Sequence, residues 1–503
     1  MDIFQHLLYG LVVALEPMNL VFCFLGVLIG TLVGVLPGIG PVAAISLLLP
    51  ATFHVPPVTS IIMLAGIYYG AMYGGSTTSI LVNIPGEVAS VVTCLDGYQM
   101  ARKGRAGAAL GISAFGSFIA GTLGIIGLAF VAPPLAGIAL RFGPPEYFTL
   151  MILGLIIITF LSGGSMLKSL MMASLGIVIG NIGMDLITAQ PRFTFGIDLL
   201  IDGVGLVPVV MGLFGVSEVF LNIERNLTNQ NVFKSEIKGL LPNMEEWKRS
   251  TWPIIRGSVI GFFLGILPGG GAIISSFVSY GIERKLSKHP EEFGKGAIEG
   301  VAGPESANNS AVAGAFIPLL TLGIPSNVVM AIMLGALMIY GVAPGPQLIA
   351  KHPDIFWGTV SSMYIGNVML LVLNLPLIGL WVKILKIPYP ILFPLILVFC
   401  IIGSYSLNNN VAEVGLMFLF GILGYLFKKF KYDSAPLALA MVLGPLIDNS
   451  LRQSLLMSGG SGMIFITRPI CLINLMIVMV IFLLALFPQI SRLRKIAVEA
   501  EDA

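Results

Sequence analysis

Apolar runs of about twenty residues follow one another along almost the whole chain, and few charges separate them. Of the 503 residues, 56% are hydrophobic and 10% are charged, whereas a soluble domain carries about 25% charged residues. A chain of this composition cannot cover itself with a hydrated surface. The runs suit membrane-spanning helices rather than the roughly ten-residue strands of an outer-membrane barrel. We therefore expect an all-α polytopic membrane protein with about twelve transmembrane helices.

The charge, cysteine and histidine patterns exclude several classes of protein. The formal net charge is +2, and no basic stretch is interleaved with aromatic residues, so nucleic acid is not an expected partner. The four cysteines and four histidines are scattered and form no set of zinc ligands. No nucleotide-binding motif or nucleophile elbow is present. We expect no cofactor, no catalytic residue and no metal, with Na⁺ as a coupling ion the one exception to consider.

Three short segments occur twice, in the same order, on either side of a charged stretch. Such a series indicates an internal duplication. We predict a first transmembrane repeat over 1–222, a cytoplasmic linker over 223–250, and a second repeat with a C-terminal helix and a short tail over 251–503. The matches are GVLPGIG at 34–40 with GILPGGG at 265–271 (265 − 34 = 231), NIPGE at 83–87 with GIPSN at 323–327 (323 − 83 = 240), and VMGLFGVSE at 210–218 with VLGPLIDNS at 442–450 (442 − 210 = 232).

Basic residues fall at different places in the two halves. After its GxLPGxG segment the second half has Arg284, Lys285 and Lys288, whereas the first half has no Lys or Arg between 47 and 60. Cytoplasmic loops are enriched in Lys and Arg, so these equivalent loops are expected on opposite sides of the membrane. The two repeats are therefore predicted to be inverted, with a cytoplasmic C-terminus.

The GxLPGxG segments interrupt apolar runs. Proline removes a backbone donor and glycine permits unusual turns, so a helix is expected to break within the membrane. Broken or re-entrant helices in transporters point their N-termini at anionic substrates. A kink that only shapes helix packing is the alternative. The backbone positions predicted to bind a carboxylate are Gly38, Ile39, Gly40, Gly269, Gly270 and Gly271.

Each break is followed by a second segment, at 68–87 and at 303–327, that is polar but carries few charges. Its hydroxyls and amides can donate to carboxylate oxygens or accept toward Na⁺. Polar groups are costly in lipid, and a binding cavity accounts for them, although hydrogen bonding between helices is an alternative. The predicted substrate-binding side chains are Ser76, Thr77, Thr78, Ser79, Asn83, Asn308, Asn309 and Ser310.

Two carboxylates, Glu87 and Glu305, adjoin these polar segments. Either can carry a proton or bind a coupling cation, and capping of a helix N-terminus is the alternative role. An acid beside an anionic substrate repels it unless the acid is protonated or paired with a cation. The coupling-ion candidates are Asn83, Glu87, Glu305 and Asn327.

Long stretches of the chain resemble the large membrane subunit (TctA-like) of the tripartite tricarboxylate transporter family. They include GTLVGVLPGIGPVAAISLLLP at 30–50, YYGAMYGGSTTSILVNIPGE at 68–87, LDGYQMARKGRAGAALGISAFGSFIAG at 95–121 and GILPGGGAIISSFVSYGIE at 265–283. The resemblance implies a multi-pass permease of the bacterial inner membrane, working with a small membrane subunit and a periplasmic solute-binding protein.

The resemblance also implies a mechanism. The chain is then a secondary active transporter subunit that imports an organic carboxylate, such as the tricarboxylate citrate, on a Na⁺ or H⁺ gradient. Alternating access, in an elevator form, fits inverted halves with re-entrant hairpins. A stand-alone ion or metabolite exporter is the runner-up. A membrane-embedded enzyme ranks third, because few carboxylates remain to form its catalytic pair.

Overall fold

The computed structural model describes residues 3–36, 40–161, 165–185, 187–224, 239–269, 271–384 and 389–485. Within these residues the chain is almost entirely helical, except for one antiparallel ribbon of β1 (Gly183–Met184) and β2 (Pro191–Arg192). Six of the described helical segments are long and apolar enough to cross a membrane, and several apolar helices are shorter. The chain is therefore an all-α multi-pass membrane protein, and the number of about twelve spans stays a prediction.

The first half of the chain contains ten α-helices and short turns of 3₁₀- or π-helix. They are α1 (Ile3–Leu15), α2 (Pro17–Val35), α3 (Gly40–Leu48), η1 (Pro50–His54), α4 (Pro57–Val82), η2 (Val88–Ser90), α5 (Val91–Arg102), α6 (Ala106–Ala139), α7 (Pro144–Leu161), α8 (Met166–Gly180), η3 (Asp198–Leu200), α9 (Leu206–Val210), η4 (Met211–Val216) and α10 (Ser217–Glu224), counted within the described residues. The last three run on as one span over Leu206–Glu224.

The second half begins with a helix that starts inside the predicted linker. Asn243 caps α11 (Met244–Ile266) by accepting from the backbone N–H of Glu246, whose side chain accepts from the N–H of Asn243 in return. The remaining described elements are α12 (Gly271–Leu286), η5 (Pro290–Glu292), α13 (Glu299–Leu322), α14 (Val328–Ile339), α15 (Leu348–Lys351), α16 (Pro353–Asn374), α17 (Ile378–Ile384), α18 (Tyr389–Asn408), α19 (Val411–Lys429), α20 (Ala435–Met457), α21 (Ile464–Thr467) and α22 (Pro469–Ala485).

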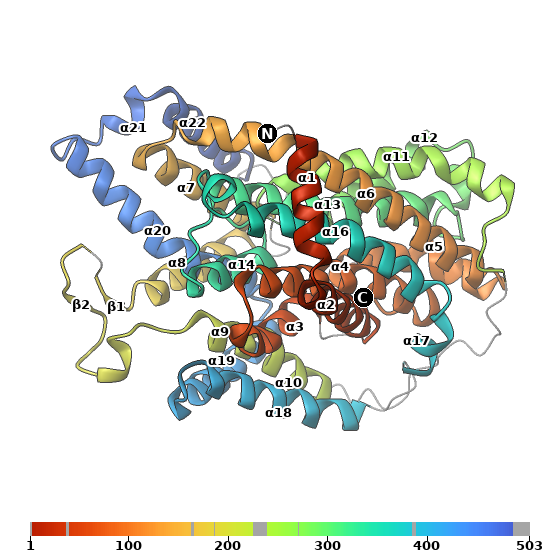
Figure 1. Ribbon diagram of the computed structural model, residues 1–503, viewed down its shortest axis with the longest axis horizontal. Coiled ribbons are helices and arrows are strands. Elements are labelled where there is room, and N and C mark those ends of the chain that lie inside the picture. The colour runs from red at the N-terminus through yellow and green to blue at the C-terminus, as the bar shows by residue number, and fades with distance from the viewer. Residues whose placement is uncertain are drawn as a thin grey trace.

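Two helices, α4 and α13, form the centre of the molecule. Every residue of α4 from Thr59 to Val82 and every residue of α13 from Glu299 to Thr321 is buried. Helices α2, α6, α11 and α16 pack around them, and α1 crosses in front of this bundle in Figure 1. The ribbon of β1 and β2 lies at the far left of the same view, beside α8 and α20. The polar segments at 68–87 and 303–327 therefore lie inside the protein.

A row of glycines lets α2 approach the backbone of α4. Gly26, Gly30 and Gly34 recur every fourth residue, and a Cβ atom built on them would lie 2.3, 2.5 and 2.2 Å from the carbonyl oxygens of Met63, Ile67 and Ala71, respectively. No real Cβ atom fits at those distances. Small residues at this spacing are typical of closely packed membrane helices.

The same packing holds α11 against α13. A Cβ atom built on Gly257, Gly261 and Gly265 would lie 2.3, 2.0 and 2.2 Å from the carbonyl oxygens of Gly303, Ala307 and Ala311, respectively. These glycines follow those of α2 at an offset of 231 (257 − 26), and their partners follow those on α4 at 240 (303 − 63). The two helix pairs thus use corresponding residues along their whole contact.

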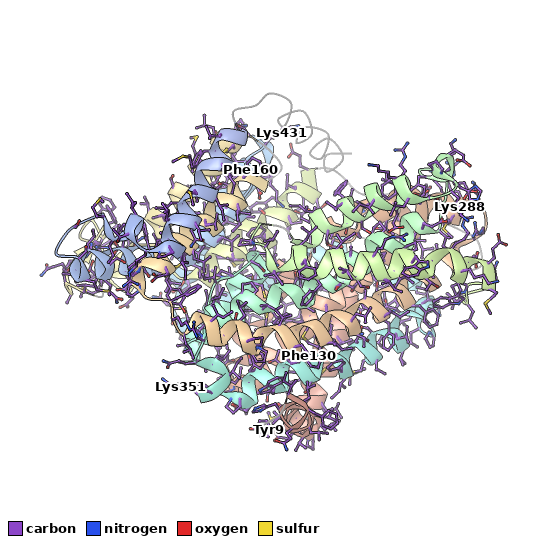
Figure 2. All side chains as sticks on the ribbon, turned by 90° about the horizontal axis from the view of Figure 1, so that it is seen from above. Tyr9, Phe130, Phe160, Lys288, Lys351 and Lys431 are labelled. Atoms are coloured by element: carbon purple, nitrogen blue, oxygen red, sulfur yellow. The ribbon has the colours of Figure 1, made fainter. Side chains whose placement is uncertain are left out.

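Lys288 and Lys351 lie far apart along the long axis of the molecule (Figure 2). Lys288 is at the right-hand end of Figure 2, and Lys351 is toward the left. The sides of the loops and of the C-terminus stay predictions, and residues 486–503 lie outside the described residues.

An ion-pair cluster ties the β ribbon to α20. The Asp185 carboxylate accepts from the backbone N–H groups of Thr188 (2.7 Å) and Ile187 (2.8 Å). It also pairs with Arg192 at 2.5 Å and with Arg452 of α20 at 3.1 Å. Both arginines reach Asp448 as well, at 2.9 and 3.1 Å, so two carboxylates share two guanidinium groups.

Asp185→Asn is expected to make the stability of the protein less sensitive to acid. The N–H groups of Thr188 and Ile187 together with Arg192 hold the pKa of Asp185 at about 2. A carboxyl group whose pKa is lowered by folding contributes stability above its unfolded pKa of about 3.9, and loses that contribution as the pH falls toward 2. The thermal midpoint of the wild type should therefore fall more steeply than that of Asp185→Asn between about pH 4 and pH 2. Parallel curves would contradict this.

Candidate functional site

Each of the two central helices ends in the same local structure. Helix α4 ends at Asn83 (φ 60°) and α13 at Gly323 (φ 70°), both left-handed, and an Ile-Pro pair follows each. Glu87 then caps η2 by accepting from the N–H of Ala89 at 2.7 Å, and Asn327 caps α14 by accepting from the N–H of Met330 at 3.0 Å. The two matching segments therefore both interrupt a helix and restart it with a side-chain cap.

The GxLPGxG interruptions lie beside these second interruptions. The N–H of Gly269 (φ 108°) donates to the carbonyl of Ser326 at 2.8 Å in the second half. In the first half Gly86 lies against the carbonyl of Gly34, where a Cβ atom would come within 2.0 Å. Both helices therefore break where predicted, and each half brings its two breaks together.

Three of the predicted backbone positions, Gly38, Ile39 and Gly270, lie outside the described residues. Gly40 begins α3 in a left-handed conformation (φ 65°). Gly271 begins α12, and a Cβ atom on it would lie 2.6 Å from the carbonyl oxygen of Leu264. The chain therefore turns back closely on the end of α11 after this break.

Glu305 is buried between the two central helices. Ser76 of α4 donates to its Oε2 atom at 2.5 Å, and the Thr93 hydroxyl of α5 donates to its Oε1 atom. Asn309, one turn further along α13, donates to the Glu305 backbone carbonyl at 3.0 Å and to Ser117 of α6 at 2.8 Å. Residues of both halves thus hold one buried carboxylate.

Glu87 lies close to this carboxylate and is linked to α13. The Asn308 side-chain amide donates to Glu87 Oε1 at 3.2 Å, while Glu87 Oε2 makes the cap described above. Glu87 is 7% exposed and Glu305 is 0% exposed. Within the described residues, no Lys, Arg or His forms an ion pair with either of them. Two buried acids without a cationic partner are costly unless a proton or a bound cation neutralises them.

A corresponding contact joins the halves a second time. Asn327 donates through its side-chain amide to the hydroxyl of Tyr68 at 3.1 Å. Asn327 follows Glu87 by 240 residues, and Asn308 follows Tyr68 by the same 240. The contact of Glu87 with Asn308 and the contact of Asn327 with Tyr68 are therefore equivalent. In each, the residue after the helix break of one half contacts the residue at the matching position in the central helix of the other half.

The family model for the tripartite tricarboxylate transporter TctA family matches residues 20–439 of this chain. The chain belongs to that family. A relative in Agrobacterium vitis, named an uncharacterized 52.8 kDa protein in the TAR-I ttuC′ 3′ region, is 53% identical over 502 residues, 100% of each chain. Another, an uncharacterized protein in the TAR-II ttuC′ 3′ region of the same organism, is 53% identical over 234 residues, 46% of this chain and 97% of the relative. No solved structure matches.

The remaining predicted residues of this TctA-family chain fall into two groups. Thr77, Thr78 and Ser79 are buried; Thr78 donates to the carbonyl of Val35 at 2.7 Å, and Ser79 donates to Ser90 at 2.9 Å. These bonds tie α4 to the neighbouring breaks. Asn83 is exposed at the end of α4, and its assignment to substrate or cation stays a prediction.

Two hydroxyls of α13, those of Ser306 and Ser310, have no hydrogen-bond partner within the described residues, although both side chains are buried. Ser310 is one of the predicted substrate ligands. Buried hydroxyls without a partner are uncommon and call for an explanation. They offer donors to a bound ligand, which is the role that the sequence predicts for Ser310.

Sequence reasoning missed Tyr68, Thr93 and Ser117, which complete the polar cluster. Tyr68 belongs to the polar segment at 68–87, but an aromatic residue in an apolar helix is usually a core residue. Its signal was the offset of 240, which pairs it with Asn308. Thr93 and Ser117 carry no comparable signal, because only the packing of α5 and α6 brings them near α13.

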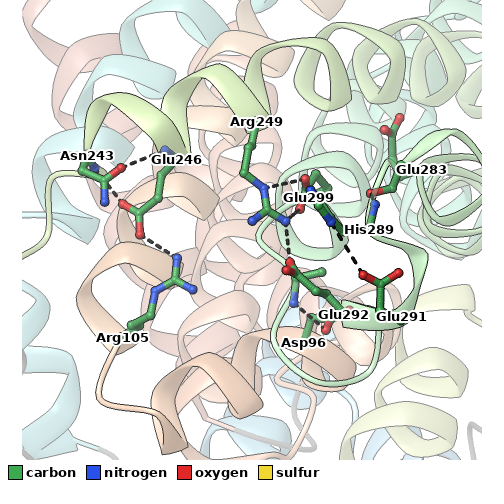
Figure 3. A network of polar contacts seen from close by, with 12 residues as sticks. Asp96, Arg105, Asn243, Glu246, Arg249, Glu283, His289, Glu291, Glu292 and Glu299 are labelled. Atoms are coloured by element: carbon green, nitrogen blue, oxygen red, sulfur yellow. Dashed lines mark hydrogen bonds and ion pairs between the residues drawn. The ribbon is translucent and has the colours of Figure 1, made fainter.

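A second polar network joins the halves near one end of α13. Asp96 of α5 accepts from the N–H groups of Gly296 and Ala297, at 2.7 and 2.8 Å, and from the Tyr280 hydroxyl at 2.9 Å. In Figure 3, Arg249 lies between Glu292 and Glu299, with ion pairs of 2.6 and 2.8 Å. The contacts of Asp96 join the first half to the second, whereas the Arg249 pairs fix the start of α11 to the segment before α13.

Proposed function

We propose that this chain is the large subunit of a secondary active importer for organic carboxylates, with a tricarboxylate such as citrate as the first substrate to test. Its family gives the class, a component of a tripartite tricarboxylate transporter. In this proposal a periplasmic solute-binding protein delivers the substrate, and a small membrane subunit completes the complex in the bacterial inner membrane. A gradient of Na⁺ or H⁺ supplies the energy.

The observation that carries this proposal is the polar cluster between α4 and α13. Hydrogen-bond donors that can bind an anion occur there together with buried acids. The hydroxyl of Ser310 and the amides of Asn308 and Asn309 lie near Glu87 and Glu305. Hydroxyls and amides suit a carboxylate, and an uncompensated acid suits a coupling cation or proton. A site with both is what coupled uptake of an anion requires.

We also propose that the two halves are inverted repeats. The glycine rows, the interruptions and the reciprocal contacts recur at offsets of 231 and 240. A contact in which corresponding residues exchange roles is expected about a twofold axis. The different positions of the basic loops favour an axis in the membrane plane. Inverted repeats allow one half to adopt the arrangement of the other, which is the basis of alternating access and of an elevator movement.

The test is reconstitution of the chain in proteoliposomes with its small subunit and binding protein. Uptake of radiolabelled citrate and of a panel of other carboxylates is measured without ATP. We expect accumulation of at least one acid that requires the binding protein. Efflux that needs neither partner would favour the alternative of a stand-alone exporter, and uptake of another acid would change only the substrate.

A further inference from the structure

The two reciprocal contacts between the halves differ in charge. Glu87 meets Asn308, and the corresponding Asn327 meets Tyr68. Glu87 and Asn327 both cap the helical segment that follows them. Since a neutral amide caps α14, capping at this position does not require a negative charge. The charge of Glu87 therefore needs another explanation.

Glu87 has backbone N–H groups of η2 on its Oε2 side and the carbonyl ends of two helices nearby. Helix α2 ends beside Glu87, because its Gly34 carbonyl lies against Gly86, and α4 ends only a few residues before it. The carbonyl ends of helices carry partial negative charge. Within the described part of the chain no cationic side chain pairs with Glu87, whereas the η2 N–H groups satisfy only its Oε2 atom. The Oε1 atom therefore has no backbone donor and no cationic partner among the described residues, and a bound cation would neutralise its charge.

Asn308 supplies a second oxygen at the same place. Its amide nitrogen donates to Glu87 Oε1, and its Oδ1 atom is buried and has no partner among the described residues. Turning the amide over would set two acceptor oxygens against each other, so the carboxylate fixes this orientation. An unsatisfied carbonyl oxygen next to a carboxylate is a pair of ligands of the kind that Na⁺ uses in broken-helix transporters.

Glu305 differs from Glu87 in this respect. Both of its carboxylate oxygens accept from hydroxyl groups, those of Ser76 and Thr93. No described group of three or more His, Cys, Asp or Glu side chains has the arrangement of a metal centre. The oxygen pair of Glu87 and Asn308 therefore suits a monovalent cation better than a transition metal.

We propose that Glu87 Oε1 and Asn308 Oδ1 bind one Na⁺ between the two halves, and that the corresponding contact of Asn327 with Tyr68 binds none. This assignment rests on the proposed function only in taking Na⁺ as the coupling ion. One cation site per chain then lies to one side of the axis between the repeats. Binding or release of Na⁺ changes the contact between α13 and the break after α4, which is the junction that must rearrange in alternating access.

The test is binding of ²²Na⁺ to the purified full-length chain in detergent, with no partner protein and no carboxylate. The wild type should bind Na⁺ saturably, and Glu87→Gln should weaken binding at least about tenfold. The matched control is Glu291→Gln, which makes the same substitution at an acid that is 67% exposed and outside the polar cluster, and it should stay within about twofold of the wild type. If Glu87→Gln does not purify as a monodisperse protein, Asn308→Ala decides, with the same loss expected.

Three results would overturn the assignment: no saturable Na⁺ binding by the wild type at any pH between about 6 and 8.5, wild-type affinity in Glu87→Gln and Asn308→Ala, or an equal loss in Glu291→Gln. The first would indicate a proton site instead. A thermal midpoint that rises with Na⁺ in the wild type and not in Glu87→Gln would support the Na⁺ site, because a ligand of the folded state stabilises that state. Failure of carboxylate uptake with intact Na⁺ binding would overturn the transport proposal alone.

Discussion

Glu305→Gln is expected to reduce gradient-driven carboxylate uptake at least about hundredfold while leaving the chain folded. Glutamine has nearly the same shape: one of the hydroxyls of Ser76 and Thr93 can keep donating to its amide oxygen, and the other can rotate to accept from its amide nitrogen. The negative charge between α4 and α13 is lost. If the charge interacts with the coupling cation or proton during transport by about 3 kcal/mol, its loss lowers the rate about hundredfold, because each 1.4 kcal/mol is tenfold in rate. Initial rates in proteoliposomes measure the effect.

Glu291→Gln is the control for this substitution. Its side chain is 67% exposed and pairs only weakly with His289, at 3.6 Å. We expect its uptake to stay within about twofold of the wild type, as for most exposed positions. Wild-type uptake in Glu305→Gln, in vesicles that contain equal amounts of protein, would remove Glu305 from the coupling machinery.

Gly261→Val is expected to have the largest effect on stability. A Cβ atom at this position would lie 2.0 Å from the backbone carbonyl of Ala307, and backbone cannot move aside as a side chain can. Overpacking costs typically about 1–3 kcal/mol, and we expect the upper end of that range because three glycines share the contact. Thermal unfolding followed by gel filtration in detergent should show a lower midpoint or no monodisperse protein.

The packing argument has a matched control and a matched repeat. Gly415 of α19 has open space around a built Cβ atom, so Gly415→Val should leave the midpoint nearly unchanged. Gly30 corresponds to Gly261 at the offset of 231, and Gly30→Val should destabilise to a similar extent. Equal midpoints for Gly261→Val and Gly415→Val would show that the close contact of α11 with α13 does not limit stability.

Composition and local chemistry predict much of this fold. The apolar runs indicate membrane helices, and α2 and α11 end at Val35 and Ile266, within the two segments where proline and glycine predict an interruption. The polar segments at 68–87 and 303–327 are buried, as expected from the cost of polar groups in lipid. These features depend only on residues close together in the sequence.

The pairings within the site depend on packing between distant helices. The sequence places Glu305 near other polar groups of α13, but only the crossing of α4 and α5 over α13 identifies Ser76 and Thr93 as its donors. Tyr68 was predictable in principle, because the offset of 240 relates it to Asn308. The glycine rows of α2 and α11 follow the offset of 231 and were equally readable, since they adjoin the segments that revealed it.

The measurement that tests the account most directly is citrate uptake into proteoliposomes under an imposed gradient. Proteoliposomes that contain the complete complex are given a Na⁺ gradient, a pH gradient or neither, in the absence of ATP. The same experiment is run with each gradient reversed. We predict accumulation of citrate, or of another acid from the carboxylate panel, that follows the direction of one gradient and stops when an ionophore removes it. Accumulation that is indifferent to both gradients, or absent for every acid in the panel, would contradict a gradient-driven carboxylate importer.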